Sequence, residues 1–436
     1  MQARLSSEFE DTREGKDAEA IVRKCVHCGL CNATCPTYQV LGDELDGPRG
    51  RIYLIKQLLE GAEVTGSTQL HLDRCLTCRN CETTCPSGVE YGRLVDIGRQ
   101  LVEERVARPL VEKAARWVLK EGLTSALFAP ALKLGQMLRP CLPAVLKDKI
   151  PARRRAAPSA RATREQPRKV LLLRGCVQPA MMPHIDQATV HVLDAAGIGA
   201  LSASGAGCCG ALRAHLADHE GGLADMRRNI DAWWPLVAVG AVEAIVVNAS
   251  GCAQQVKQYG RALERDPEYA DRAARIASMT RDLTELLPEL VHALKDQVRI
   301  GETRDLAFHS PCTLQHGQRI RGADAHLSVF GFRVREPADS HLCCGSAGTY
   351  SVLQPALARE LRDRKLGSLH ALDAQCIVSA NVGCIQHLQS GTSTPVRHWV
   401  EVLDAALDGA RHGEVFARRN ELIEAATRSG SSQNGL

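Results

Sequence analysis

The chain has 436 residues, of which 44% are hydrophobic, 24% are charged and 4% are aromatic. This length allows two to four domains with cores of their own. The small net charge of +4 and the scarcity of aromatic side chains exclude the basic, base-stacking surface of a nucleic-acid-binding protein. The unusual feature of the composition is the presence of 18 cysteines.

The start of the chain bears on the redox state of these cysteines. Residues 1–11 are polar and acidic and contain no apolar signal-peptide core. We therefore expect a cytoplasmic location, in which thiols remain reduced. Under those conditions clustered cysteines indicate metal binding before disulfide bonds.

The first hundred residues contain one cysteine motif twice. Both copies have the form C-x2-C-x2-C-x3-C-P and start 50 positions apart. The first three cysteines of such a string bind one [4Fe–4S] cluster, and the fourth binds the other cluster of a two-cluster ferredoxin. The sequence therefore predicts two [4Fe–4S] clusters. The predicted ligands are Cys25, Cys28, Cys31 and Cys85 for cluster 1, and Cys75, Cys78, Cys81 and Cys35 for cluster 2.

A zinc site is the main alternative for these eight cysteines. It would use paired C-x-x-C elements as its four ligands and leave the third and fourth cysteine of each copy without a role. Disulfide bonds between cysteines so close in sequence would be strained. Two complete matches to the ferredoxin string favour iron–sulfur clusters over both alternatives.

A helical region connects the two motifs. Residues 46–50, Asp-Gly-Pro-Arg-Gly, predict a turn. The turn leads into a predicted helix, closed by Gly61, whose apolar side is formed by Ile52, Ile55, Leu58 and Leu59. We expect a helical two-cluster ferredoxin domain over residues 1–105.

Residues 106–168 are predicted to form a helical segment and a basic linker. Their most apolar stretch, 123–146, is interrupted by three prolines and two basic residues, whereas a membrane span needs about twenty nearly uninterrupted apolar residues. We expect its apolar face to pack on the following domain, with docking on a partner or a membrane surface as the alternative. Residues 151–168, rich in Pro, Ala and Arg, are predicted to be a solvated connector.

A second, longer repeat occupies the rest of the chain. In each half, short apolar runs alternate with helical stretches such as 223–239 and 355–372, which predicts parallel strands with crossover helices. The cysteines lie where the expected strands end, at the edge where open α/β sheets place their sites. These strands are expected at 171–173, 244–247, 306–308 and 377–379.

The predicted fold class is therefore α+β and multidomain. A helical N-terminal two-cluster ferredoxin domain is followed by two repeated α/β cysteine-rich domains, at 169–295 and 300–410. Residues 428–436 are rich in Ser and Gly, and we expect a disordered tail there.

Each cysteine-rich domain contributes four cysteines. They are Cys176, Cys208, Cys209 and Cys252 in the first domain, and Cys312, Cys343, Cys344 and Cys384 in the second. Four thiolates can bind a further iron–sulfur cluster or a zinc ion, and the alternatives are redox-active thiols or a structural role at a tight glycine turn. For His309, His316 and His341, which lie near these loops, we expect hydrogen-bonded surface or core roles before ligation.

Residues 205–210 match the dinucleotide-binding pattern G-x-G-x-x-G. The equivalent stretch of the second half, 340–345, keeps Cys-Cys-Gly and loses the other glycines. The feature that the two halves share is therefore the cysteine pair, and we expect neither FAD nor NAD in this chain.

The cysteine-rich halves resemble the CCG domains of heterodisulfide reductases and related respiratory subunits. Full versions of that motif have five cysteines and end in C-x-x-C. Ala249 and Asn381 stand where the first cysteine of this closing pair would be. The departure weighs against a five-thiolate cluster of the heterodisulfide reductase type and against direct disulfide chemistry.

Over nearly its full length the chain resembles the iron–sulfur subunits of bacterial glycolate oxidases, also called glycolate dehydrogenases. Related subunits for anaerobic glycerol-3-phosphate and lactate oxidation share this architecture. The resemblance rests on both cluster motifs and on the stretches 25–29 (CVHCG), 41–56 (LGDELDGPRGRIYLIK), 73–88 (DRCLTCRNCETTCPSG), 229–235 (NIDAWWP) and 340–350 (SHLCCGSAGTY).

This resemblance implies that FAD-binding partner subunits oxidise glycolate to glyoxylate and that the iron–sulfur subunit relays the electrons toward the quinone pool. It also implies a peripheral position on the cytoplasmic face of the inner membrane. We therefore expect an oxidoreductase subunit that leaves substrate oxidation to its partners. The alternatives are the equivalent subunit of a lactate or glycerol-3-phosphate dehydrogenase complex, a heterodisulfide-reductase-like thiol/disulfide enzyme, and a metal-stapled scaffold without electron transfer.

Overall fold

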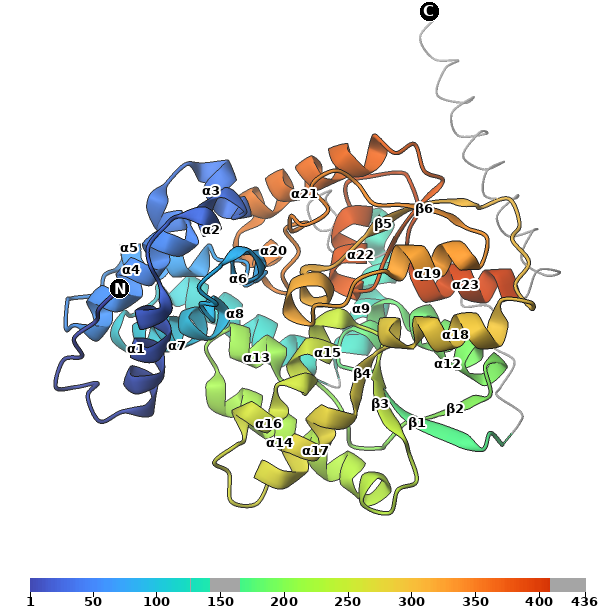
Figure 1. Cartoon of the computed structure of the whole chain (residues 1–436), viewed down its shortest axis with the longest axis horizontal. Coiled ribbons are helices and arrows are strands. Elements are labelled where there is room, and N and C mark those ends of the chain that lie inside the picture. The colour runs from blue at the N-terminus through green and yellow to red at the C-terminus, as the bar shows by residue number, and fades with distance from the viewer. Residues whose placement is uncertain (126, 142–164, 408–436) are drawn as a thin grey trace, which may run out of the picture.

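The computed structural model describes residues 1–125, 127–141 and 165–407. The tail expected at 428–436 and most of the expected basic connector lie outside the described residues. In the part that the structure describes, an N-terminal group of helices lies beside two α/β halves (Figure 1). The predicted fold class, a helical region followed by α/β cysteine-rich halves, is confirmed.

Helices α1 to α7 form the N-terminal region, at the blue end of the colours in Figure 1. The apolar faces of its longer helices pack into one core, to which α1 contributes Val22, α4 contributes Ile55 and α7 contributes Leu94. The bounds are α1 Arg13–Lys24, α2 Leu30–Ala33, α3 Pro36–Leu41, the 3-10 helix η1 Glu44–Asp46, α4 Pro48–Leu59, α5 Gly66–Asp73, α6 Asn80–Thr84 and α7 Tyr91–Arg105.

The helix expected between the two cysteine motifs is α4. Pro48 occupies its first position, where a missing backbone N–H removes no helical hydrogen bond. The predicted turn at 46–50 therefore already contains the start of the helix. The helix ends at Leu59, and Gly61 follows with a φ of +88°, a left-handed conformation that glycine adopts readily. The expected helix and its closure by glycine are confirmed.

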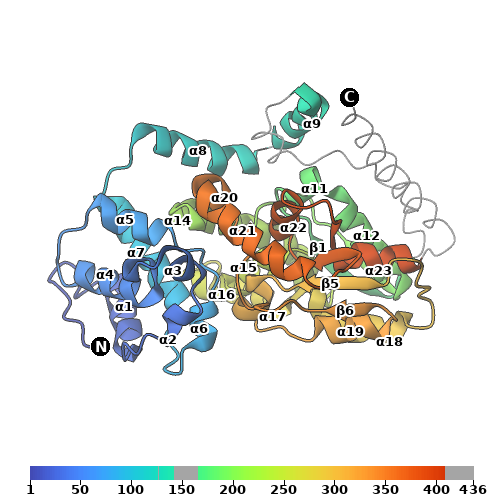
Figure 2. The ribbon, with the colours of Figure 1, turned by 90° about the horizontal axis from the view of Figure 1, so that it is seen from above.

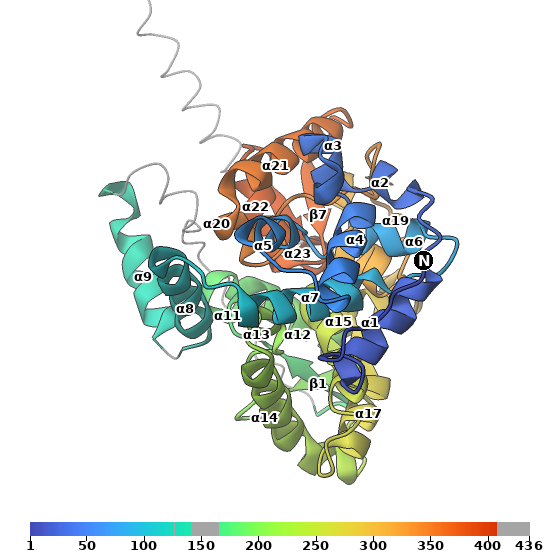
Figure 3. The same cartoon turned by 90° about the vertical axis from the view of Figure 1, so that its left-hand side faces the viewer.

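Helices α8 (Leu110–Thr124) and α9 (Phe128–Leu138) follow the N-terminal region and lie at the periphery of the molecule (Figures 2 and 3). The 3-10 helix η2 (Arg139–Cys141) ends the described part of this segment. Among the described residues, no helix is long and apolar enough to cross a membrane. The expected packing of the stretch 123–146 on the next domain is met only in part among the described residues: α9 contacts α11 (Gln178–Met181) but buries only Leu132.

The first cysteine-rich half contains a four-stranded parallel sheet in the order β2-β1-β3-β4. Its strands are β1 Arg168–Leu173, β2 Ile198–Leu201, β3 Ala244–Val247 and β4 Thr280–Asp282. Its helices are α11 Gln178–Met181, α12 Pro183–Ala195, α13 Ala211–His215, α14 His219–Ala238, α15 Ser250–Lys257, α16 Tyr259–Ala262, α17 Ala270–Met279, the 3-10 helix η3 Leu283–Leu286 and α18 Leu287–Leu294.

The second half repeats this topology, with a parallel sheet in the order β6-β5-β7-β8. Its strands are β5 Asp305–His309, β6 Arg333–Arg335, β7 Cys376–Ser379 and β8 Val396–His398. Its helices are the π-helical turn η4 Thr313–Gly317, α19 Ala323–Val329, α20 Tyr350–Leu353, α21 Pro355–His370, α22 Val382–Gln389 and α23 Trp399–Leu407.

The two halves share one hydrophobic core. Leu172 of β1 belongs to the same contiguous cluster of buried side chains as Phe308 of β5 and Val378 of β7. The backbone also joins them, because the N–H of Ser250 donates to the carbonyl oxygen of Ala380 at 3.0 Å. The halves therefore pack as one unit, in which the cysteine loops of both sheets are held on a common support.

The N-terminal region contacts the second half directly. The hydroxyl of Tyr350 in α20 donates to the carbonyl oxygen of Arg74 at 3.2 Å, and the side-chain amide of Asn80 donates to the carbonyl oxygen of His341 at 3.1 Å. Helix α21 lies beside α3 (Figure 1). The second cysteine motif, at positions 75–85, is therefore covered by the second half.

Candidate metal centres

The structure brings four cysteines of the two ferredoxin motifs together in a group that we call set 1: Cys25, Cys28, Cys31 and Cys85. Burial raises the pKa of the Cys31 thiol to about 11, and the charges of the other three cysteines of the set add to this shift. Cys25 and Cys85 end helices α1 and α6, and Cys31 lies in α2. Because Cys28 is exposed, set 1 lies at the surface of the N-terminal region.

The remaining cysteines of the two motifs form set 2: Cys35, Cys75, Cys78 and Cys81. Burial raises the pKa of Cys81 well above its usual range, and the other three members of the set raise it further. Cys35, Cys75 and Cys81 are buried, so set 2 lies deeper than set 1. Each set combines three cysteines of one motif with the fourth cysteine of the other.

The loops between the first three cysteines have the same backbone shape in both motifs. His27 and Gly29 in the first loop, and Thr77 and Arg79 in the second, have φ angles between 52° and 81°. Residues of alternating handedness turn successive N–H groups toward one side, and such concave segments bind anions. The N–H of Thr77 donates to Sγ of Cys75 at 3.4 Å. Four thiolates in an N–H-lined loop fit an anionic iron–sulfur cluster.

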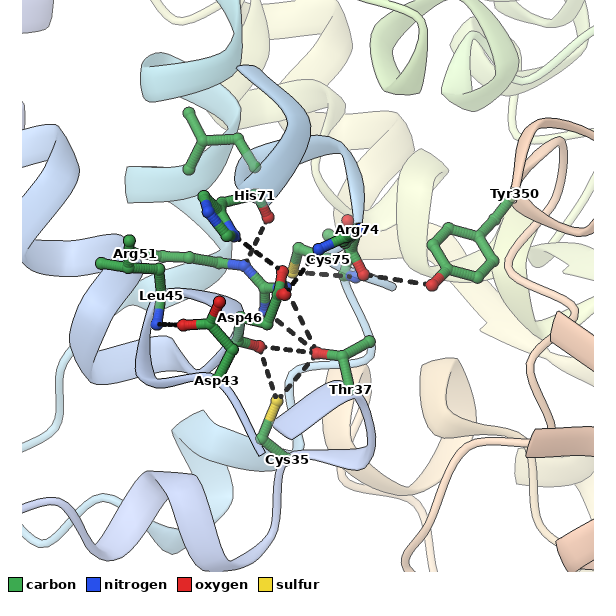
Figure 4. Close-up of polar contacts among 12 residues, drawn as sticks. Cys35, Thr37, Asp43, Leu45, Asp46, Arg51, His71, Arg74, Cys75 and Tyr350 are labelled. Atoms are coloured by element: carbon green, nitrogen blue, oxygen red, sulfur yellow. Dashed lines mark hydrogen bonds and ion pairs between the residues drawn. The ribbon is translucent and has the colours of Figure 1, made fainter. Parts of the chain in front are cut away.

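A buried arginine lies beside set 2 (Figure 4). The side chain of Arg51 in α4 is only 1% exposed. Its Nε donates to the carbonyl oxygen of His71 at 2.7 Å, and its terminal nitrogens donate to the hydroxyl of Thr37 at 3.2 Å. Asp46 is its ion-pair partner at 3.4 Å. The hydroxyl of Thr37 in turn lies 3.3 Å from Sγ of Cys35, so the arginine is linked to a cysteine of set 2.

The charge of Arg51 is retained by its surroundings. Burial alone would lower the pKa of its guanidinium, but negative charge on Tyr91, Cys75, Cys35 and Asp46 raises the pKa overall. A fixed positive charge next to thiolates favours the more negative, reduced form of any centre that they hold. Sequence reasoning missed Arg51, because no motif marks it: it lies beside the apolar residues of α4, outside both cysteine motifs.

Asp43, Asp46 and His71 also lie within ligand distance of one another. Asp46, however, is ion-paired with Arg51 at 3.4 Å and with Arg74 at 2.8 Å. We therefore interpret this trio as part of a buried charge network and not as a metal site.

The first cysteine-rich half brings its four cysteines together at the carboxyl ends of its strands. Interaction with the neighbouring thiols of Cys176 and Cys209 lowers the pKa of Cys208, and Cys209 also adjoins Cys252. The glycine of the Cys-Cys-Gly turn, Gly210, has a φ of +89°, and a side chain there would come within 2.8 Å of the Gly222 carbonyl oxygen. Only glycine fits this turn.

A buried network positions the cysteine pair of the first half. The side-chain amide of Asn229 in α14 donates to the carbonyl oxygen of Cys208 at 2.7 Å, and the hydroxyl of Tyr259 donates to that of Cys209 at 3.0 Å. The stretch 205–210, which matches a dinucleotide-binding pattern, is therefore the loop that holds this cysteine pair against α14.

The second half also brings its four cysteines together. Cys312 adjoins Cys343, Cys343 adjoins Cys344, and Cys344 adjoins Cys384. The side-chain amide of Asn381, which stands in the place of a fifth cysteine, donates to Sγ of Cys384 at 3.5 Å. The row extends into the ferredoxin motifs, because Cys312 also adjoins Cys78 of set 2.

The three histidines near these loops differ in their surroundings. Nε2 of His316 donates to the His341 carbonyl oxygen, and Nδ1 is hydrogen-bonded to the Thr83 hydroxyl, each at 2.9 Å. The expected hydrogen-bonded role is confirmed for His316. It is wrong for His309, which is 1% exposed and has no hydrogen-bond partner for either ring nitrogen among the described residues.

A buried lysine in the second half is another residue that sequence reasoning missed. Lys365 of α21 is 3% exposed, and its ammonium donates to the carbonyl oxygen of Asp339 at 2.7 Å. Burial lowers its pKa, while the thiolates of Cys312, Cys344 and Cys343 act in the opposite direction. Its burial could have been predicted from the sequence, since Lys365 lies among the apolar residues of α21 that face the core.

Comparisons with known proteins agree with this geometry. Residues 21–89 match the family described as "4Fe-4S dicluster domain", and residues 170–257 and 306–389 match the CCG family, described as "Cysteine-rich domain". The sequence is 51% identical over 414 residues to the glycolate oxidase iron-sulfur subunit of Escherichia coli K12, an alignment that covers 94% of this chain and all of the relative. The chain belongs to the family of glycolate oxidase iron–sulfur subunits.

More distant relatives match this chain over different lengths. The probable glycolate oxidase iron-sulfur subunit of Bacillus subtilis is 28% identical, over 94% of this chain and 97% of the relative. Lactate utilization protein A of Shouchella clausii is 26% identical, but the alignment covers 53% of this chain and 96% of the relative. The chain is thus an iron–sulfur oxidoreductase subunit of the glycolate oxidase type.

Proposed function

We propose that this chain is the electron-transfer subunit of a glycolate-oxidising complex and that sets 1 and 2 each hold one [4Fe–4S] cluster. One observation carries the proposal: each set gathers three cysteines of one ferredoxin motif and the fourth of the other in an N–H-lined loop. A bound [4Fe–4S] cluster accepts and releases one electron at a time. The oxidation of glycolate to glyoxylate belongs to FAD-binding partner subunits.

We assign the docking site of the FAD-binding partner to the surface of set 1. Cys28 is exposed there, and the apolar side chains of Val26 and Leu30 on the same loop are 67% and 54% exposed. Apolar side chains around a donor or acceptor site are typical of the core of a protein–protein interface. Set 2 is covered by the second half and offers no comparable surface among the described residues.

A cavity of about 580 Å³ beside set 2 is the candidate site for a quinone acceptor. Cys75 and Leu76 of the second ferredoxin motif line one wall, and Tyr350 and Leu353 of α20 line another. Its volume lies in the range of small-molecule sites, and its lining also contains charged side chains such as Asp73, Arg99 and Glu112. The Tyr350 hydroxyl and the imidazole of His215 supply further polar groups. Reduction of a quinone to a quinol takes two electrons, delivered singly, and two protons.

Helix α8 is attached to the protein by its polar side. Arg108 and Arg116 pair with Asp73 of α5 at 2.7 and 3.0 Å, and Glu121 pairs with Arg213 of α13 at 2.8 Å. The apolar side therefore faces outward. The outer face of α8 and α9 consists of Leu110, Val111, Trp117, Val118, Leu127, Leu134, Met137 and Leu138, which are between 50% and 84% exposed.

We propose that this outer face docks on an anionic membrane surface. Residues 106–168 contain fourteen Lys and Arg against four Asp and Glu, so the segment that presents the apolar side chains is also strongly basic. Apolar burial combined with attraction to anionic lipids is the mode of interfacial helices. The cavity beside set 2 is lined by Arg108 and Pro109 at the start of α8, so a quinone leaving the membrane would reach it over a short path.

Glycolate is favoured over lactate as the substrate of the complex. The relatives named for lactate utilization are 24–26% identical and match about half of this chain, whereas the relatives named for glycolate oxidase match 94% of it. For the domain limits we propose 1–105, 106–168, 169–295 and 300–410, which the bounds of the helices and strands support.

The test is to mix the anaerobically purified chain with glycolate and the FAD-binding subunits. Reduction of the clusters is measured as the loss of their visible absorption. Val26→Glu and Leu30→Glu place charge on the proposed docking loop, and Val239→Glu, at an exposed position of the first half (76% exposed), is the matched control. We expect the two loop variants to slow reduction at least tenfold while reduction by dithionite stays unchanged. Reduction at the rate of the control would disprove the docking site, and absence of any glycolate-dependent reduction would disprove the function.

A further inference from the structure

A histidine without a hydrogen-bond partner lies inside the second cysteine-rich half. His309 is the last residue of β5 and is 1% exposed. Neither of its ring nitrogens has a hydrogen-bond partner among the residues that the structure describes. Burying an imidazole without partners costs free energy, so a native structure retains such a group only when something else compensates for it.

The ring of His309 lies against two cysteines. A ring nitrogen of His309 and the sulfurs of Cys344 and Cys384 all lie within 4.8 Å of one another, and all three residues are buried. Cys343 lies outside this group of three and adjoins it through Cys344. Ligand atoms of a tetrahedral site with metal–sulfur bonds of about 2.3 Å are separated by about 3.8 Å. The three grouped donors are therefore close enough for one metal ion to draw them together, and the neighbouring Cys343 would complete the site.

The first half has no imidazole at the corresponding place. His309 precedes the first cysteine of its half, Cys312, by three residues, and in the first half Leu173 precedes Cys176 by three residues. Leu173 also ends its strand and is 2% exposed. A leucine therefore fills this strand-end position well, and packing alone gives no reason for an unpartnered histidine there.

The charge around the four donors fits a metal–thiolate site. The buried ammonium of Lys365 lies near the thiolates of the second half. Among the described residues no carboxylate lies within ion-pair distance of this lysine. A divalent ion with three thiolates and one neutral imidazole carries a net charge of −1, which a single buried ammonium balances. Zinc and iron both accept such a mixture of thiolate and imidazole ligands.

We propose that His309, Cys343, Cys344 and Cys384 bind a thiophilic transition metal, with His309 as its imidazole ligand. The metal is either zinc or the iron of an iron–sulfur centre, since both use this ligand chemistry. Zinc would brace the second half, whereas iron would form a third redox centre next to set 2. The inference concerns the second half alone and does not depend on the clusters of sets 1 and 2.

The test compares the whole chain with two substitutions of His309, purified without oxygen. His309→Leu copies the residue of the first half, so we expect it to fold. His309→Cys replaces the imidazole with another metal ligand. His398→Leu removes the other fully buried histidine that ends a strand of the same sheet (0% exposed) and serves as the control. The readouts are iron and zinc per chain, together with nitrogen coordination from ¹⁴N electron spin-echo modulation for iron or X-ray absorption for zinc.

We expect His309→Leu to lose one metal centre relative to the unsubstituted chain, and His309→Cys to keep the metal but lose the nitrogen signal. His398→Leu should keep both. Loss of zinc identifies a zinc site and loss of iron an iron–sulfur centre, and either supports the proposal. Unchanged metal content and nitrogen signal in His309→Leu would overturn it. The proposal would also be overturned if sets 1 and 2 accounted for all the metal in the unsubstituted chain. Empty sets 1 and 2 would be a different result, which bears on the proposed function and not on this site.

Discussion

Cys312, in the second cysteine-rich half, lies beside Cys78 of the second ferredoxin motif. The two residues belong to a small buried cluster that also contains Leu76 and Tyr350. The hydrogen bond from Tyr350 to the carbonyl oxygen of Arg74, at 3.2 Å, holds this interface closed. The cysteines of the ferredoxin region and those of the second half therefore form one continuous row of sulfur atoms.

This contact predicts that the second half influences set 2 and not set 1. Replacing Cys312 by serine removes a thiol that touches Cys78 and should change the EPR signal and the reduction potential of one of two clusters. Cys176→Ser, at the corresponding position of the first half, is the control, because Cys176 neighbours Cys208 of its own half. Equal effects of the two substitutions would show that the contact has no electronic consequence.

The charge of Arg51 should raise the reduction potential of the cluster in set 2. Its buried guanidinium lies near Cys75 and Cys35, and removing it by Arg51→Met should lower that potential on the order of 100 mV, the effect of a unit charge at about 7 Å in a medium of effective dielectric constant near 20. Arg51→Lys should preserve most of the effect. Potentiometric EPR titration measures both clusters in one sample, and a shift confined to the set 1 cluster would contradict the ligand assignment.

The sequence predicted the buried inner strands of both sheets but not their edge strands. The inner strands β1, β3, β5 and β7 are buried on both faces and read as continuous apolar runs, so all four were predicted. The edge strands were not predicted, because they are short and, apart from β2 (Ile-Gly-Ala-Leu), partly polar; β6 is Arg-Val-Arg with both arginines exposed. Edge pairing depends on a neighbour distant in sequence, and local pattern contains little information about it.

The candidate sites also differ in how well the sequence predicts them: local motifs are predictable, and contacts between distant residues are not. Sets 1 and 2 follow from the spacing of cysteines within about sixty residues, which the chemistry of ferredoxins constrains. The contact of Cys78 with Cys312 joins residues more than two hundred positions apart, and nothing local predicts it. In the sequence, His309 is marked only by its place at the end of an apolar run. Its neighbours in the structure are needed to tell a metal ligand from a packed core residue.

The glycines of the Cys-Cys-Gly turns should be irreplaceable for stability. Gly345 has a φ of +86°, and an added Cβ would lie 2.6 Å from the carbonyl oxygen of Ala358. We expect Gly345→Ala to lower the free energy of unfolding by roughly 2–3 kcal/mol, from left-handed strain and the clash together. Gly367→Ala in α21 is the control, since no atom lies within 4 Å of its added Cβ, and it should be neutral or slightly stabilising. Thermal unfolding of the two variants side by side measures the difference.

The buried histidine His398 should make the protein less stable in mild acid. Burial lowers its pKa to about 4, compared with about 6.5 in the unfolded chain. Below pH 6.5 the unfolded state therefore binds a proton that the folded state does not, and stability falls by up to about 1.4 kcal/mol per pH unit down to about pH 4.

The matching variant is His398→Asn, whose side-chain oxygen can still accept the hydrogen bond that Nδ1 receives from the N–H of Val400 at 3.2 Å. Melting temperatures between pH 5 and 7.5 should fall less steeply toward acid in this variant than in the unsubstituted chain. Parallel curves would mean that His398 is not protonated preferentially in the unfolded state.

The central claim, that sets 1 and 2 hold two [4Fe–4S] clusters with crossed ligands, is tested most directly by iron and acid-labile sulfide per chain combined with EPR after reduction. Anaerobically purified protein should contain at least about eight irons and as many sulfides, and Cys85→Ser and Cys35→Ser should each remove the signal of a different cluster. Protein that contains zinc and almost no iron under these conditions, or a Cys85→Ser variant that loses the same signal as Cys75→Ser, would contradict the account.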